Sequence, residues 1–170
     1  MFEGGANPMV ADDYMEQVET QLTSMNVTED HLKIILATYK FTKDAKFWWK
    51  LITNQYKVEE VSRDKFKELF YKKYFPASNK WELKNQFISL IQGNMPVTEY
   101  ENKFTSLSRF APEMVSNEVD KVQKFISGLD YKMRPLLIAQ GIKFYSEAVE
   151  KALMLEVEAK DKEARREQWR

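Results

Sequence analysis

The apolar positions of this chain recur every three or four residues, which is the period of one face of an α-helix. Four such stripes occupy the first half, on segments that begin near Pro8, Thr28, Thr42 and Ser62. Their members are Val10, Tyr14, Val18 and Leu22; Leu32, Ile35, Leu36 and Tyr39; Ala45, Trp48, Trp49, Ile52 and Tyr56; and Phe66, Leu69, Phe70 and Tyr74. We expect each stripe to face the interior of a helical bundle.

Pro76 interrupts this pattern, because proline lacks an amide hydrogen and restricts the residue before it. The stripes then resume, with glycine stops at Gly93 and Gly141 and a short helix expected over 135–140. They comprise Trp81, Phe87, Ile88 and Ile91; Val97, Tyr100, Phe104 and Leu107; Val119, Val122, Phe125, Ile126 and Leu129, after a Ser116 cap; and Val149, Ala152, Leu153 and Leu155. The pattern predicts an all-α fold of two lobes, an N-terminal one over residues 1–76 and a C-terminal one over 77–170.

Composition supports helices and disfavours sheets. The 170 residues include only five glycines and five prolines, too few for the turns of a β-sandwich or barrel. Aromatic residues make up 14% of the chain, and large rings suit small lobes with thin cores.

Charge is balanced overall but unevenly distributed. Lys plus Arg and Asp plus Glu each number 26, whereas a dedicated nucleic-acid binder is usually basic. Residues 1–30 hold seven acidic and no basic residues, and residues 31–75 hold eleven basic and five acidic ones. Either the two segments neutralise each other by packing, or a basic surface meets RNA or another subunit.

The sequence offers few of the residues and motifs that catalysis usually needs. There is no cysteine, His31 is the only histidine, and no glycine-rich phosphate-binding motif occurs, so we expect no enzyme, cofactor or metal site. No segment is apolar enough to span a membrane, and Met1–Val10 lacks a signal-peptide pattern, so a cytoplasmic location is expected.

Two sets of residues allow both a binding and a structural interpretation. Trp48 and Trp49 resemble a stacking platform for bases, but helix neighbours point about 100° apart, which favours core packing. The segment after Ser62 carries a basic face that either contacts RNA phosphates or another subunit, or is simply solvated. Its members are Arg63, Lys65, Lys67, Lys72 and Lys73.

Four short motifs occur in an order typical of one protein family. Residues 90–107 resemble the major homology region of retroviral and retrotransposon capsids, with Gln92, Gly93, Tyr100, Lys103, Phe104 and Leu107 at the characteristic positions. Residues 45–49, residues 66–76, and residues 125–129 followed by Arg134 resemble three further motifs of Gypsy-class Gag proteins. Each motif alone is weak, but four in register are specific. The chain therefore resembles the Gag capsid proteins of LTR retrotransposons over roughly residues 2–158.

The resemblance implies two helical capsid lobes, self-association through the C-terminal lobe, and assembly in the cytoplasm into virus-like particles that package retrotransposon RNA. It also implies that Gln92, Gly93 and the Tyr100–Leu107 stripe organise the C-terminal lobe. Without cysteine the chain lacks the zinc knuckle of many Gag proteins, so RNA binding by this segment should be weak. The alternative is a domesticated copy, like neuronal Arc, that binds a partner peptide without forming particles.

We predict that stability does not depend on a metal ion, because the chain has no thiolate and a single imidazole. Adding EDTA should leave the midpoint of thermal unfolding unchanged. A fall in the midpoint that zinc reverses would contradict this prediction.

Overall fold

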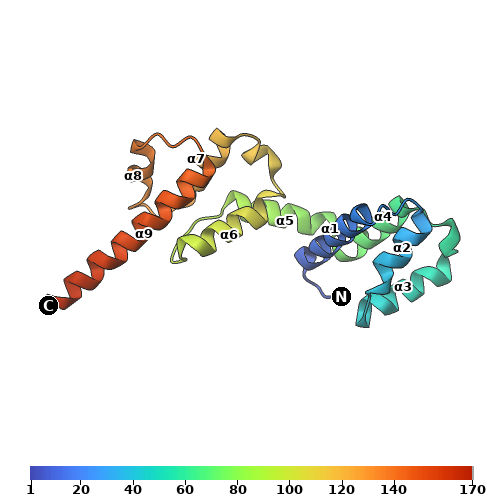
Figure 1. The fold of residues 1–170 in the computed structure, drawn as a ribbon. Helices are drawn as coiled ribbons and strands as arrows, with labels where there is room; N and C mark the ends of the chain where they lie inside the picture. The colour runs from blue at the N-terminus through green and yellow to red at the C-terminus, as the bar shows by residue number, and fades with distance from the viewer. Residues whose placement is uncertain (170) are drawn as a thin grey trace. The chain divides into compact units, whose positions relative to one another are not determined.

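The computed structural model describes residues 1–169, which contain nine α-helices, two 3₁₀ turns and no β-strand (Figure 1). The one β-type contact there is an isolated bridge between Phe2 and Phe41. The prediction of an all-α fold is therefore confirmed. None of the helices formed by these residues combines the length and apolarity that a membrane span requires.

Internal contacts divide the chain into two units, Met1–Lys80 and Trp81–Arg170. This division falls inside helix α5 (Ala77–Ile88), which begins directly after Pro76. The lobe boundary at residues 76 and 77 stays a prediction.

The first unit is a bundle of four main helices. They are α1 (Pro8–Ser24), α2 (Asp30–Tyr39), α3 (Lys43–Gln55) and α4 (Arg63–Tyr74), with the 3₁₀ turn η1 (Val58–Glu60) before α4. The Asn7 side chain caps α1 by accepting from the amide of Met9, and Pro8 opens the helix where no amide donor is needed. Ser62 caps α4 through the amide of Lys65, as its position before the stripe suggested.

Aromatic rings fill the core of this unit, and Phe2 lies at their centre. Its ring lies 4.9–5.7 Å from those of Tyr14, Phe41, Phe70 and Tyr74. The backbone of Phe2 is held on both sides, because its amide donates to Lys40 and its carbonyl accepts from Thr42. Large rings bury much area each, which suits a bundle of short helices.

The interior face predicted for α2 is wrong. Ile34 and Ala37 are buried, whereas Leu32, Ile35, Leu36 and Tyr39 are exposed. α2 packs on α1 and α4, and its buried face includes the small Ala37, which permits close approach of the neighbouring helices. Periodicity identified the stripe of larger apolar residues on this helix, but the neighbouring helices cover the opposite face.

The second unit contains the end of α5, then α6 (Val97–Ser108), η2 (Pro112–Val115), α7 (Glu118–Gly128), α8 (Arg134–Ala139) and α9 (Tyr145–Gln168). The first half of α9 packs on α6 and α7 with Ala148 and Ala152 buried, and residues 157–169 are exposed. Asn117 caps α7 through the amide of Asp120, so the expected Ser116 cap is wrong by one residue.

The burial expected around α5 is also wrong in part. Phe87 is fully buried, as expected, but Trp81, Ile88 and Ile91 are exposed. The buried face of α5 instead consists of Leu83 and Phe87, one turn apart, and Ile91 lies beyond the helix in the loop that follows.

Two buried tyrosines of the first unit offer a matched test. The Tyr14 hydroxyl donates to the carbonyl of Ala37, whereas the buried Tyr74 hydroxyl has no hydrogen-bond partner among residues 1–169. We predict that Tyr14→Phe lowers the free energy of unfolding by about 1 kcal/mol, and that Tyr74→Phe leaves it unchanged or raises it. Urea titration measures both, and equal losses in the two variants would contradict the hydrogen-bond assignment.

The same tyrosines make stability sensitive to alkaline pH. Burial raises the pKa of Tyr14 to about 12, and burial with the charge of Asp44 raises the pKa of Tyr74 to about 12. Above about pH 10 the unfolded chain loses these protons while the folded chain keeps them, so stability falls as pH rises toward 12. Tyr74→Phe should make this fall shallower.

Candidate functional site

Gln92 is the buried polar residue around which the major-homology-like segment is built, with a side chain 4% exposed. Its side-chain amide nitrogen donates to the carbonyl of Met95 at 3.0 Å, and its side-chain oxygen accepts from the amide of Asp130 at 2.9 Å. Its backbone amide donates to the carbonyl of Gly128 at 2.7 Å. Gln92 thereby fastens the loop before α6 to the end of α7.

Gly93 makes the turn that this arrangement needs. Its φ of +53° lies in the left-handed region, which side chains with a Cβ rarely adopt. The space around it is open, so the conformation and not the packing favours glycine here. The amide of Met95 closes the turn by donating to the carbonyl of Gln92 at 3.0 Å.

Tyr100 joins two motifs that lie far apart in the sequence. Its ring is fully buried on α6, and its hydroxyl donates to the carbonyl of Phe125 on α7 at 2.9 Å. A Cβ on Gly128 would lie 2.1 Å from that hydroxyl oxygen, so only glycine fits there. Tyr100 and Gly128 therefore set how closely α6 and α7 approach.

Phe104 occupies the centre of the aromatic core of this unit. Its ring lies 5.1 Å from Phe87, 5.4 Å from Phe125 and 5.5 Å from Tyr145. Leu107, one turn later on α6, is buried on the same face. Lys103 is separate from this core, because it is exposed and pairs with Glu99 at 3.0 Å on the surface of α6.

Three residues that hold the site together were missed by the sequence interpretation. Glu156 of α9 accepts from the amide of Val97 at 2.8 Å and so caps α6, and Lys124 donates to the carbonyl of Ile88 at 2.7 Å. Tyr145 begins α9, and its amide donates to the carboxylate of Glu118 at 2.7 Å. Their partners lie between 27 and 59 residues away, so no local pattern revealed them.

Trp48 and Trp49 lie side by side on α3, both half-buried. Trp48 contacts the rings of Phe41, Phe70 and Tyr74, and Trp49 lies 5.3 Å from Phe66 in an edge-to-face arrangement. Both rings thus pack against the core of the first unit.

The basic face of α4 is partly neutralised inside the first unit. Arg63 and Lys67 both pair with Glu19 of α1, and Lys65 pairs with Glu68 at 3.0 Å. Burial by itself raises the pKa of Glu19, but the hydrogen bonds and charges of Arg63 and Lys67 outweigh it and lower that pKa below its ordinary value. Lys72 and Lys73 are exposed in the last turn of α4, where the helix dipole favours positively charged side chains.

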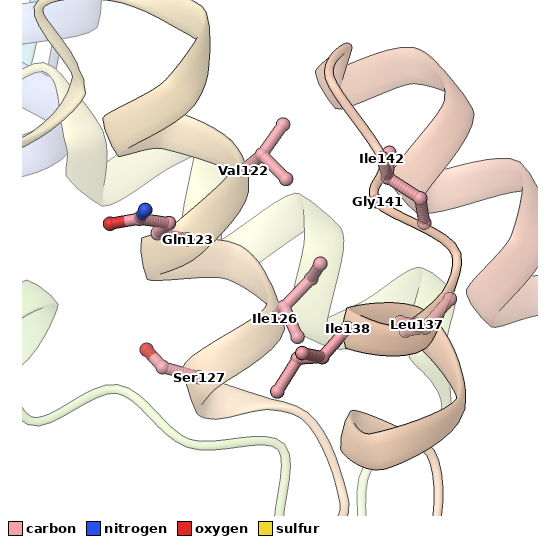
Figure 2. Close-up of a pocket in the computed structure, with 8 residues that line it drawn as sticks. All are labelled: Val122, Gln123, Ile126, Ser127, Leu137, Ile138, Gly141 and Ile142. Carbon is pink, nitrogen blue, oxygen red and sulfur yellow. The ribbon is translucent and has the colours of Figure 1, made fainter.

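An apolar cleft of about 280 Å³ opens between α7 and α8 in the second unit (Figure 2). Val122 and Ile126 of α7 face Leu137 and Ile138 of α8 across it, and Gln123 and Ser127 lie along one side (Figure 2). The side chain of Ile138 is 68% exposed. This surface carries apolar groups suited to contact with another protein and no titratable side chain suited to catalysis.

The described residues form no group of three or more His, Asp or Glu side chains that could hold a metal ion. His31 is exposed at the start of α2. The described residues thus form a helical fold of two units, in which the buried Gln92 joins the loop before α6 to the end of α7.

Comparison with known proteins then gives the family. The model of the Ty3 transposon capsid-like protein family matches residues 1–165, and the chain belongs to this family. The resemblance to Gypsy-class Gag capsids is thereby confirmed, and with it a structural role of the Gag type.

Comparisons with curated proteins and with solved structures do not extend the family assignment. A search of curated proteins gave no match. A solved structure entitled dARC1 capsid domain dimer aligns with 92% of this chain and 94% of its own, at 16% identity and a TM-score of 0.41. That likeness is too low to support an inference about function.

We predict that Gln92→Leu destabilises the second unit, because it leaves the partly buried Asp130 amide and Met95 carbonyl without their hydrogen-bond partner. Each unpaired buried group costs about 1–3 kcal/mol. Gln140→Leu is the matched control, since Gln140 is exposed and its side chain has no hydrogen bond among the described residues. Urea unfolding followed by circular dichroism compares them, and equal free energies of unfolding would show that the Gln92 network is not stabilising.

Proposed function

We propose that this chain is the capsid subunit of a Gag-type retrotransposon protein, and that copies of it self-associate in the cytoplasm into particles that package RNA. The observation that carries the proposal is the match to the Ty3 capsid-like family over residues 1–165. A net charge of zero agrees with it, because like subunits of this composition repel one another little.

The apolar α7–α8 surface is the contact that we assign to self-association. Its cleft is lined mainly by aliphatic side chains, and one of them, Ile138, is 68% exposed. Exposed apolar groups that cluster around a concave surface mark protein contact sites. A capsid needs many individually weak contacts whose sum is strong, and a surface of this modest size suits that requirement.

RNA contact by this segment should be weak. Three of the five residues on the basic α4 face are engaged in ion pairs within the first unit. Lys72 and Lys73 are the members of that face that remain for phosphate contacts. We therefore expect packaging to depend on the summed contacts of many assembled copies.

We predict that the protein is a monomer or dimer when dilute and forms larger species as its concentration rises. Ile138→Glu should weaken this assembly, because it places a charge on the apolar α7–α8 surface. Val157→Glu is the control, since Val157 is similarly exposed on α9 outside the cleft. Light scattering across protein concentration measures both variants.

The effect of added salt on assembly distinguishes apolar contacts from ionic ones. Added salt should promote assembly if apolar contacts dominate and oppose it if acid–base pairing does, and we expect promotion. A strict monomer at every concentration, with or without RNA, would overturn the proposal. That outcome would favour a module that binds a partner peptide without forming particles.

A further inference from the structure

Helix α2 carries an apolar stripe that the first unit covers only in part. Leu32, Ile35, Leu36 and Tyr39 follow the i, i+3, i+4, i+7 spacing of a single helix face, and their exposed fractions are 44%, 42%, 38% and 83%. The opposite face of the same helix holds Ile34 and Ala37, each 2% exposed or less. Exposed apolar side chains gathered on one face of this ten-residue helix mark a contact site for another protein.

We propose that this partner is α2 of a second copy of the chain, packed antiparallel about a two-fold axis that passes between residues 35 and 36. The contact is separate from the α7–α8 surface. It deepens the proposed self-association, and its biological use rests on that proposal.

The stripe has the symmetry that an antiparallel pair requires. Reversing the helix about the midpoint between Ile35 and Leu36 places Leu32 opposite Tyr39 and Ile35 opposite Leu36. Every apolar member of the stripe therefore meets an apolar residue of the second copy. A two-fold interface must be self-complementary in this way, because both copies present the same surface.

Charge at the two ends of the helix favours the same arrangement. Glu29 is the exposed residue at the N-cap, and Lys40 is the half-buried residue at the C-cap, whose ammonium group also donates to the side-chain oxygen of Gln21 at 3.1 Å. On a helix of 3.6 residues per turn, both lie on the same flank of the stripe. In the antiparallel pair Glu29 of each copy lies within about one turn of Lys40 of the other, on the same side of the interface.

Four side chains per copy bury less than the roughly 800 Å² per partner of a standard stable interface, so the pairing should be weak by itself. Two contacts of this kind on one chain would link copies in series, because α2 lies in the first unit and the α7–α8 surface in the second. Weak contacts at two places suit reversible assembly.

Introduced thiols test the register directly, because the chain has no cysteine of its own. Next to the two-fold axis, Ile35→Cys or Leu36→Cys should form a disulfide with the same residue of a second copy. Leu32→Cys should not, since its two copies are offset by about 10 Å along the helix and a disulfide needs Cα atoms within about 7 Å. A mixture of Leu32→Cys and Tyr39→Cys chains, one carrying a size tag, should cross-link between the two kinds of chain.

The experiment uses the full chain under mild oxidation, read on non-reducing gels, at concentrations where the wild type assembles. Val10→Cys, which is exposed on α1 of the same unit, reports random collision. We expect Ile35→Cys dimers to exceed Val10→Cys and Leu32→Cys dimers several-fold. Circular dichroism confirms that each variant is folded before comparison.

The outcomes separate this inference from the proposed function. Equal cross-linking of Leu32→Cys and Ile35→Cys indicates a parallel or random encounter and overturns the antiparallel pairing. No cross-linking above the Val10→Cys level, in a chain whose wild type assembles, overturns the α2 contact but leaves the capsid role standing. A wild type that stays monomeric throughout overturns both.

Discussion

The close approach of α6 and α7 at Gly128 is the constraint on which the second unit depends. The Tyr100 ring lies against the backbone of Gly128, where a Cβ would come within 2.1 Å of the tyrosine hydroxyl. With the helices this close, the hydroxyl reaches the carbonyl of Phe125, and Gln92 reaches the end of α7. The ring of Phe104 then packs between Phe87 and Phe125. One glycine without a side chain therefore permits both a polar network and an aromatic core.

The first unit forms its core in a different way, with aromatic rings from several short helices. Short helices enclose little volume, so a few large rings provide most of its core. Phe2 enters this core from an extended segment and is held by backbone hydrogen bonds to residues 40 and 42. Glu19 gathers Arg63 and Lys67 at the contact of α1 with α4, which joins the acidic opening segment to the basic one that follows it.

The distribution of apolar residues between inside and outside connects the fold with the family. Both units bury an aromatic core, yet each also leaves apolar side chains in water, on α2 in the first and around α7 and α8 in the second. A solitary soluble protein rarely keeps such clusters exposed. Such exposed clusters agree with the self-association that we propose for this member of the Ty3 capsid-like family. The buried Gln92 and the half-buried Glu156 position helices, since each accepts a hydrogen bond from a backbone amide.

The sequence by itself determined the helical class and the family, because a period of three to four residues and motifs in a fixed order are local properties. It also pointed to Tyr100, Phe104 and Gly93, whose burial or turn follows from their immediate neighbours. Only the tertiary structure decided which face of α2 is covered, because the neighbouring helices pack on Ile34 and Ala37 and not on the larger stripe that begins at Leu32. It alone revealed the cap that Glu156 supplies to Val97 across 59 residues, and the engagement of Arg63 and Lys67 by Glu19. Such pairings depend on where distant segments meet in space, and periodicity along the chain carries no information about that.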